Sequence, residues 1–257
     1  MPLSRRAKII IGAAVIACLA IGLPVVGISL MNTNNNLIRF NKLENAGVMI
    51  EAYGTRIYID PINLPQSYEA FPADLILITH PHADHYQADM VSMLQKSGTV
   101  NVFPENMTTA IIVHDGIGVN PLDELDVGIV HVTAFYMYTF DVPPYPATHP
   151  REANWTSYII DINGFTFFHA GDSKNILEYY QISETIDVAL LPLGPGCQTM
   201  ANEEVVAALN RIQPRYFVPI HYAEGANTEW ISIYGSQVTN CQILDIGYWQ
   251  GYTFFPI

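Results

Sequence analysis

A six-residue segment, His-Pro-His-Ala-Asp-His at positions 80–85, constrains this chain more than any other feature of its sequence. It follows Leu-Ile-Leu-Ile-Thr at positions 75–79, an apolar run that is typical of a buried strand. Loops that follow strands on a rigid scaffold often carry chemical function, and imidazole and carboxylate groups together suit zinc and its neighbours. Solvated loop histidines do occur, but ligand residues at such short spacing favour a transition-metal site.

The first thirty residues differ from the rest of the chain. Arg5, Arg6 and Lys8 precede an uncharged apolar stretch at positions 9–30, and about twenty such residues are needed to cross a bilayer. We therefore predict one N-terminal transmembrane helix within residues 1–30, a single-pass membrane anchor or signal-anchor. Because basic residues before a span stay in the cytoplasm, the rest of the chain is expected on the extracytoplasmic side.

Other interpretations of this stretch stay open. It could be a buried core helix or a cleaved signal peptide, and Val-Ile-Ala-Cys at positions 15–18 resembles a bacterial lipobox in which Cys18 would be lipidated. A polar linker at 31–36 then leads to a single domain at 37–257, which is long enough for a sizeable core.

The charge and cysteine content exclude some classes of protein. All 24 acidic residues but only 8 of the 11 Lys and Arg residues lie after residue 30. Nucleic-acid backbones are bound by neutralising basic residues, so no nucleic-acid partner is expected. The three cysteines form no Cys-x-x-Cys pair, which argues against a thiolate zinc site or a disulfide framework. Whether Cys197 and Cys241 pair stays open.

Short apolar runs separated by turn residues predict strands in both halves of the chain. They lie at 48–53, 56–60, 75–79, 100–103, 129–135, 157–161, 165–170, 188–193, 216–220 and 252–255. Helices are predicted at 203–212, with Asn202 as the N-cap, and more briefly at 89–96 and 174–181. Hairpins followed by strand-helix-strand units in both halves indicate a layered α/β fold of two mixed sheets with helices outside.

Three later residues at the ends of predicted strands complete the candidate metal site. His149 precedes the strand at 157–161, Asp172 follows the strand at 165–170, and His221 ends the strand at 216–220. With the segment at 80–85 they provide three or four ligands for each of two ions. The predicted ligands are His80, His82, Asp84, His85, His149, Asp172 and His221.

These residues carry a resemblance to a known family. The order of the motifs over residues 37–257 resembles the metallo-β-lactamase superfamily. Leu-Leu-Pro-Leu-Gly at 190–194, Thr-Met at 199–200 and Val-Pro-Ile-His-Tyr at 218–222 resemble the compact metal-dependent hydrolases related to ascorbate-6-phosphate lactonase. The resemblance implies an αββα sandwich with a metal pair between the sheets at one edge. It also implies one ion held by His80, His82 and His149, a second held by Asp84, His85 and His221, and Asp172 between them.

Two departures from the family pattern bear on function. Gly-Asp-Ser at 171–173 replaces the common Gly-Asp-Thr, which keeps a hydroxyl beside the bridging carboxylate. Gly-Pro-Gly-Cys-Gln at 194–198 replaces a Gly-Gly pair, which changes a loop expected to face the substrate. His82 stands where the di-iron oxidoreductases of the superfamily have Glu, and this disfavours redox chemistry at iron.

The expected chemistry is hydrolysis. A bound divalent ion lowers the pKa of water from near 16 to about 7, so we predict a hydrolase with two Zn²⁺ ions, Mn²⁺ or another divalent metal being possible. An ester, lactone or phosphoester-type substrate, either a small molecule or a lipid, is expected. Asp84 is the predicted catalytic residue, because it could orient or deprotonate the attacking water. Two alternatives stay open, a membrane-associated phosphodiesterase similar to N-acylphosphatidylethanolamine phospholipase D and an inactive metal-binding module.

The remaining histidines and the residues near the motifs are harder to assign. His131, inside a predicted strand, competes only weakly with His149 as the intermediate ligand. His169 is either a hydrogen-bonding support for the metal ligands or a core histidine. Tyr222, Thr199 and Cys197 could contact substrate, although each is more often a packing or turn residue.

Overall fold

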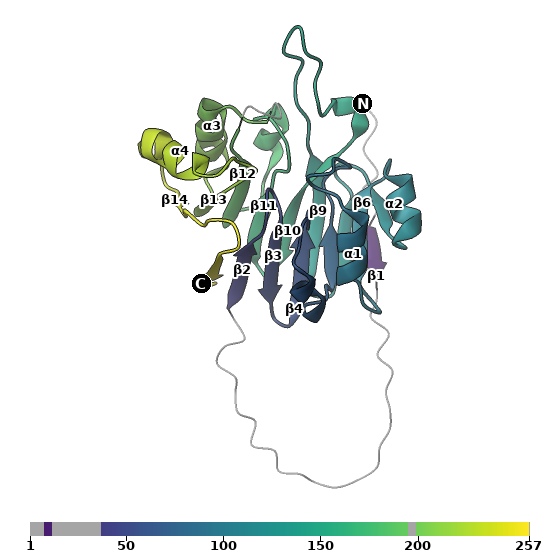
Figure 1. Cartoon of the computed structure of the whole chain (residues 1–257). Helices are drawn as coiled ribbons and strands as arrows, with labels where there is room; N and C mark the ends of the chain where they lie inside the picture. The colour runs from purple at the N-terminus through teal and green to yellow at the C-terminus, as the bar shows by residue number, and fades with distance from the viewer. Residues whose placement is uncertain (1–7, 12–36, 195–198, 257) are drawn as a thin grey trace, which may run out of the picture.

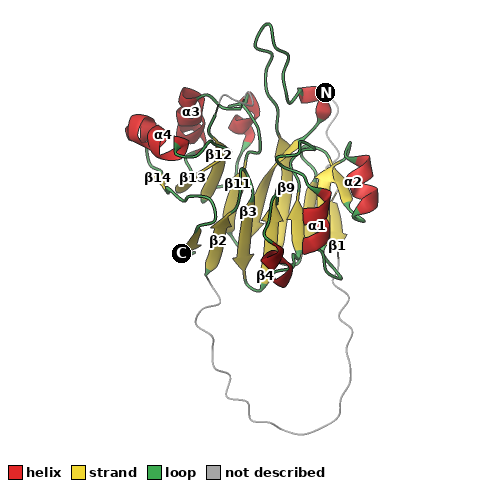
Figure 2. Ribbon diagram, in the orientation of Figure 1, coloured by secondary structure: helices red, strands yellow, loops and turns green. Residues whose placement is uncertain are grey.

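The computed structural model describes residues 8–11, 37–194 and 199–256. These residues form two β-sheets that lie face to face, and helices cover the outer faces of both sheets (Figure 1). Colouring by secondary structure shows the strands together at the centre and the helices around them (Figure 2). The predicted layered α/β arrangement of two mixed sheets is confirmed.

The first sheet contains seven described strands in the order β15-β2-β3-β4-β5-β6-β7. Neighbouring strands are antiparallel from β15 to β4 and parallel from β4 to β7. Their bounds are β2 Ile38–Lys42, β3 Val48–Ala52, β4 Thr55–Ile59, β5 Leu75–Leu77, β6 Val100–Pro104, β7 Ile117–Val119 and β15 Gly251–Phe254. The first and last strands of the domain, β2 and β15, therefore pair with each other.

The second sheet contains eight described strands in the order β1-β8-β9-β10-β11-β12-β13-β14. Strands β8 to β11 are antiparallel, and β11 to β14 are parallel. Their bounds are β1 Lys8–Ile11, β8 Glu124–Val127, β9 Val130–Tyr136, β10 Thr156–Ile162, β11 Phe165–His169, β12 Val188–Pro192, β13 Tyr216–Ile220 and β14 Gln242–Ile243. The hairpin predicted from Asn163-Gly164 joins β10 to β11.

An apolar core fills the space between the sheets. Phe40 of β2 stacks on Phe167 of β11 with ring centroids 6.3 Å apart, and Phe254 of β15 meets both rings edge-on. All three side chains are buried. Each ring of this size removes about 150–250 Å² from water, so these contacts contribute strongly to holding the two sheets together.

The described residues form four α-helices, which cover the outer faces of the sheets, and four short 3-10 turns. Helices α1 and α2 lie against the first sheet, and α3 and α4 lie against the second. There the ring of Trp230 packs on that of Phe217 of β13, with ring centroids 5.5 Å apart. The bounds are α1 Ala88–Leu94, α2 Thr108–Val113, α3 Asn202–Ile212, α4 Ala226–Tyr234, η1 Gln66–Ala70, η2 Arg151–Ala153, η3 Leu177–Gln181 and η5 Gly235–Gln237.

Two helix predictions need correction. Of the helix predicted at 174–181, only the 3-10 turn η3 at Leu177–Gln181 forms. The residues before it belong to a loop, in which Lys174 donates its backbone N–H to the Tyr138 carbonyl. Helix α3 begins at Asn202, and its N-cap is Ala201. The Glu204 carboxylate accepts the Ala201 N–H at 2.7 Å, so a side chain inside the first turn satisfies this backbone donor.

The predicted transmembrane helix falls mainly on residues 12–30, which lie outside the described residues, as does the linker at 31–36. Residues 9–11 of that stretch belong to β1, a strand parallel to β8, so the helix prediction is wrong at these positions. Three consecutive isoleucines there favour a strand because they are β-branched. Within residues 8–11, 37–194 and 199–256, no helix combines the length and the apolar character that a bilayer span requires.

The residues with candidate chemistry lie in loops that leave the sandwich where strands end. From the first sheet, residues 80–85 follow β5. From the second sheet, Asp172 follows β11, His221 follows β13, and His149 lies between β9 and β10. Because ligand sites in α/β folds form outside the carboxyl ends of strands, this edge is where a functional site is expected.

Candidate metal centre

The seven predicted ligand side chains meet at this edge in three overlapping groups. Within each group the potential ligand atoms all lie within 4.8 Å of one another. The groups are His80, His82 and His149; Asp84, His85 and His221; and His80, His85 and Asp172. The structure thus brings together residues from both sheets, and their role as metal ligands remains a prediction.

In the first group, Nε2 of His149 lies 3.2 Å from Nε2 of His80. The other ring nitrogen, Nδ1, of each of these two histidines lies beside a threonine hydroxyl. Nδ1 of His80 lies 3.0 Å from the Thr79 hydroxyl, and Nδ1 of His149 lies 2.9 Å from the Thr148 hydroxyl. Burial lowers the pKa of His80 well below its usual value and that of His149 to about 4. The rings are therefore neutral at pH 7, the form that binds metal.

The second group is linked through Asn45. The Asn45 amide donates to the Asp84 backbone carbonyl at 2.9 Å and to the Asp84 carboxylate at 3.4 Å. The backbone carbonyl of Asn45 in turn accepts the backbone N–H of His221 at 3.1 Å. Both Asn45 and His221 have left-handed backbone conformations, with φ of 55° and 51°. Such conformations cost free energy outside glycine and gather at functional sites.

Asp172 lies between the two groups. One of its carboxylate oxygens is 3.0 Å from Nε2 of His85, and the other is 3.3 Å from Nε2 of His221 and 3.4 Å from Nε2 of His149. Burial raises the pKa of Asp172, but the surrounding imidazoles, His85 first, outweigh this effect and hold the pKa below its usual value. The carboxylate is therefore ionised and surrounded by nitrogen ligands.

Two atoms at the centre of the cluster are buried without a hydrogen-bond partner among the described residues. They are Nε2 of His85 and the Asp172 oxygen beside it. These two atoms face each other as an ion pair, 3.0 Å apart. Buried polar atoms in folded proteins are normally paired, and imidazole nitrogen with carboxylate oxygen suits divalent zinc, manganese and iron. The residues present therefore fit a bound divalent cation.

Asp60 supports this cluster and was missed from the sequence. It is fully buried at the end of β4, and one oxygen accepts a hydrogen bond from Nδ1 of His85 at 2.8 Å. The other oxygen accepts the Thr79 N–H at 2.8 Å. A carboxylate behind a histidine fixes its tautomer and orientation for a metal. The available signal was an acidic residue directly after the apolar run at 57–59.

His169 supports the turn that carries Asp172. Its Nε2 donates to the Ala46 carbonyl at 2.8 Å, and its Nδ1 accepts the Gly171 N–H at 3.2 Å. Gly171 has φ of +55°, and a Cβ there would lie 2.6 Å from the sulfur of Met137. The tight turn between β11 and Asp172 therefore requires glycine.

The other singled-out residues lie in different surroundings. His131 on β9 is paired with Asp126 at 2.6 Å, with its side chain 41% exposed and outside the three groups. Thr199 is buried, and its hydroxyl donates to the Gly194 carbonyl. Cys197 lies outside the described residues. Cys241 is a free thiol, and burial raises its pKa to about 12.

A hollow of about 470 Å³ opens beside Asp84, and we name it the tyrosine pocket. It is lined by Glu44, Asn45, Ile62, Asn63, Ala83, Asp84, Tyr222 and Tyr248. Asp84 is the most exposed member of the three ligand groups. The tyrosine pocket therefore gives solvent and small molecules a route to the second group.

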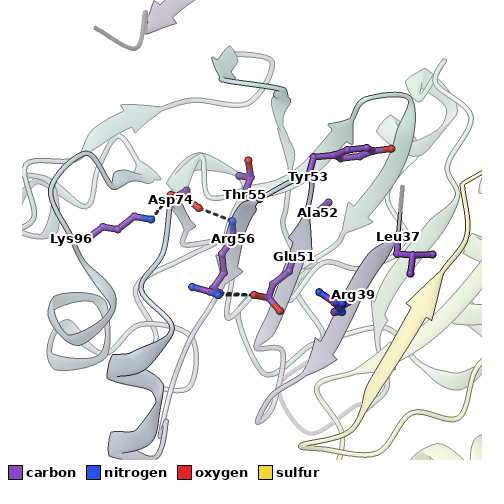
Figure 3. Close-up of a pocket in the computed structure, with 10 residues that line it drawn as sticks. Leu37, Arg39, Glu51, Ala52, Tyr53, Thr55, Arg56, Asp74 and Lys96 are labelled. Atoms are coloured by element: carbon purple, nitrogen blue, oxygen red, sulfur yellow. Dashed lines mark hydrogen bonds and ion pairs between the residues drawn. The ribbon is translucent and has the colours of Figure 1, made fainter. Parts of the chain in front are cut away.

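A different hollow, of about 240 Å³, lies at the opposite ends of β4 and β5 (Figure 3). Four of its charged side chains pair with one another, Arg56 with Glu51 at 2.6 Å and Lys96 with Asp74 at 2.5 Å. Strands β4 and β5 run from this hollow toward the His and Asp cluster, so their length separates the two places. It contributes nothing to the candidate metal centre.

Two facing mixed sheets, outer helices and a His and Asp cluster at the strand ends define the metallo-β-lactamase-like class of folds. The family described as beta-lactamase superfamily domain matches residues 39–221, and the chain belongs to this family.

Known relatives agree with this assignment. A UPF0173 metal-dependent hydrolase from Thermococcus kodakarensis is 30% identical over 200 residues, which cover 72% of this chain and 85% of the relative. A UPF0173 metal-dependent hydrolase from Thermococcus onnurineus is 31% identical over 184 residues, 65% of this chain and 77% of the relative. Igni18, a metallo hydrolase from the archaeon Ignicoccus hospitalis, aligns with a TM-score of 0.70 at 22% identity, covering 85% of this chain and 98% of Igni18. This last likeness shows the fold alone.

Proposed function

We propose that this protein is a metal-dependent hydrolase that works with two divalent ions, zinc in the first place. The observation that carries the proposal is the position of Asp172, whose two carboxylate oxygens lie within 3.4 Å of ring nitrogens from both ligand groups. A carboxylate so placed can serve two ions at once, and the buried Nε2 of His85 beside it is a suitable ligand for one of them.

Each residue of the cluster then has an expected role. His80, His82 and His149 would hold one ion, Asp84, His85 and His221 would hold the other, and Asp172 would contact both. When bound, divalent ions supply Lewis acidity and lower the pKa of a coordinated water, which is the chemistry that hydrolysis requires. Asp60 would keep Nε2 of His85 aimed into the cluster.

Asp84 is the proposed catalytic residue. Its side chain is 47% exposed and lines the tyrosine pocket. A hydrogen bond from His221 is the main cause that lowers the pKa of Asp84, so the carboxylate is ionised at neutral pH. It would accept a hydrogen bond from the attacking water, orient it toward the substrate and receive its proton.

The relatives named as metal-dependent hydrolases support this function, and an ester, lactone or phosphoester-type bond is the proposed target. Neither alternative, the phospholipid phosphodiesterase or the inactive module, has a specific observation in its favour among the described residues. Membrane attachment and an extracytoplasmic location stay predictions, because most of the residues that would carry them lie outside the described ranges.

The test combines metal analysis with a substrate panel. The purified full-length chain would be stripped of metal and reloaded separately with Zn²⁺ and Mn²⁺. We expect close to two equivalents by elemental analysis, and metal-dependent turnover of at least one among lactone, phosphodiester, thioester and β-lactam substrates. Less than half an equivalent of any metal after loading would contradict the proposal, as would full metal loading without turnover of any bond class.

A further inference from the structure

We propose that the indole N–H of Trp155 donates a hydrogen bond to a substrate oxygen at the first ligand group, formed by His80, His82 and His149. Trp155 lies in the short connection between the turn η2 and strand β10. The inference rests on the proposed function, because it concerns the reaction at this cluster. Trp155 is not one of the ligand residues, so its role would be to bind and orient the substrate.

The indole of Trp155 contacts every imidazole of the first ligand group. Its ring centroid lies 5.4 Å from that of His80, 5.1 Å from that of His82 and 5.6 Å from that of His149. The indole plane is tilted by 34° to the His80 ring and is nearly perpendicular to the other two rings, at 77° and 73°. Trp155 therefore forms one wall of the space in which the three ligand side chains meet.

Two hydrogen bonds fix the start of β10 beside the ligand loop. The backbone N–H of Thr156 donates to the Thr79 carbonyl at 3.1 Å, and the Tyr158 hydroxyl donates to the Ile78 carbonyl at 2.7 Å. The acceptors lie directly before the segment at 80–85, so these bonds join the second sheet to the loop of the first. The indole is therefore held beside the first ligand group before a substrate binds.

The indole nitrogen of Trp155 lacks an acceptor. Its Nε1 is buried and has no hydrogen-bond partner among the described residues. An indole N–H can only donate, and a buried donor left unpaired is costly to the folded state. The adjacent histidines cannot accept this bond when they hold an ion. In a neutral imidazole that binds a metal, one nitrogen contacts the ion and the other carries the proton.

A substrate oxygen fits the missing acceptor of Trp155. Esters, lactones and phosphoesters all carry a carbonyl or phosphoryl oxygen beside the bond that is cleaved, and negative charge develops on this oxygen during hydrolysis. A donor that is already in place stabilises that charge without reorganisation. Trp155 would therefore bind this oxygen in the substrate and stabilise it further as the reaction proceeds.

The test follows the indole N–H signals of the full-length chain by NMR after labelling with ¹⁵N-tryptophan. The chain has three tryptophans, Trp155, Trp230 and Trp249, and Trp155→Phe assigns one signal by its loss. Acetate, whose oxygens stand in for the substrate acceptor, is added to the zinc-loaded protein. We expect the proton signal of Trp155 to move downfield and the other two to stay in place. Acetate that binds without moving this signal, or that does not bind at all, would overturn the inference.

Matched variants separate the N–H from the ring. Trp155→Phe keeps an aromatic wall, so it should bind zinc within about threefold of the unmodified chain but acetate about tenfold more weakly, the scale of one hydrogen bond to a charged acceptor. Trp249→Phe is the control, because Trp249 is 45% exposed and packs on Tyr68 outside the cluster. It should leave both affinities unchanged. An unchanged acetate affinity in Trp155→Phe, or an equal loss of zinc affinity, would contradict the inference.

The wild-type spectrum keeps the test decisive if Trp155→Phe does not fold, because Trp230→Phe and Trp249→Phe then assign the Trp155 signal by elimination. These measurements do not depend on turnover. A downfield shift with no hydrolysis of any panel substrate would contradict the proposed function alone. Hydrolysis by a chain whose Trp155 signal does not respond to acetate would contradict the inference alone. Failure to load zinc would contradict both.

Discussion

The carboxylate of Asp60 holds the imidazole of His85 in place, with an oxygen 2.8 Å from Nδ1. Both side chains are fully buried. Burial alone would lower the pKa of His85, but the carboxylates of Asp172 and Asp60 reverse this effect and hold the pKa well above its usual value. A metal ion that binds at Nε2 would therefore have to displace a proton, and Asp60 would then keep the ring aligned.

Replacing Asp60 by asparagine should weaken metal binding. Asp60→Asn removes the charge that orients His85 and should lower affinity for the second ion by about 10- to 100-fold. Competition with a chromogenic chelator would measure this. The matched control is Asp74→Asn, because Asp74 likewise accepts a backbone N–H, that of Arg56 at 2.8 Å, but lies at the opposite end of the sheet. Equal loss of affinity in both variants would contradict the role of Asp60.

Asp84→Asn and His82→Ala should lose hydrolysis for different reasons. His82→Ala removes a ligand of the first group, so its metal content should fall. Asp84→Asn should cut turnover by about a hundredfold or more, the scale of a lost general base, even where much of the metal remains. Metal content and turnover measured on the same samples separate the two effects, and normal turnover in Asp84→Asn would refute the proposed mechanism.

His131→Ala is the control for this pair, because His131 lies on the surface, paired with Asp126. It should keep both metal and activity. Loss of both in His131→Ala, with neither lost in His149→Ala, would show that the intermediate ligand is misassigned.

Gly171→Ala should destabilise the protein by about 2–4 kcal/mol, because overpacking adds to the cost of a left-handed backbone. The new Cβ would displace the sulfur of Met137, which lies 3.4 Å from the Asp172 backbone nitrogen. Gly128→Ala is the control, since Gly128 has φ of +60° but no atom within 4 Å of an added Cβ, and it should cost only about 1–2 kcal/mol. Urea unfolding of both variants would measure the difference, and equal losses would contradict the steric argument.

Lys42 should make the stability of the metal-free protein depend on pH. Its pKa falls from 10.5 to about 6 on folding because the amine is buried. The unfolded chain therefore binds more protons between these values, so stability rises with pH there, by up to about 1.4 kcal/mol per unit. Lys42→Met should lack this contribution. Urea unfolding at pH 7, 8 and 9 would compare the two slopes, and parallel pH profiles would show that Lys42 does not titrate as described.

Ten of the fifteen described strands could be predicted from the sequence, whereas β1, β2, β7, β8 and β14 were not. The seven candidate ligands could be chosen from the sequence and lie together in the structure, and their role as ligands stays a prediction. Alternating apolar runs mark buried strands directly, and the ligand residues are concentrated at 80–85. The supporting contacts were not predictable. Asp60 reaches His85 only because β4 and β5 pair in parallel, and Asn45 reaches Asp84 across 39 positions.

The missed helices have weak local signals. Helix α4 follows Gly225 with no side-chain cap. Helix α2 also has no side-chain cap, and it exposes 81% of Ile112, which disrupts the expected apolar face. The tertiary contacts of such helices, rather than local propensity, determine where they form.

The origin of the ligands in both sheets has a mechanical consequence. The residues at 80–85 belong to the loop of one sheet, whereas His149, Asp172 and His221 belong to loops of the other. Ions shared among them would act as cross-links between the two halves of the sandwich. Metal binding would then also stabilise the packing of one sheet against the other. Removal of the ions would therefore weaken the contact between the two sheets first at this edge. The aromatic contacts of Phe40, Phe167 and Phe254 would keep the halves together elsewhere.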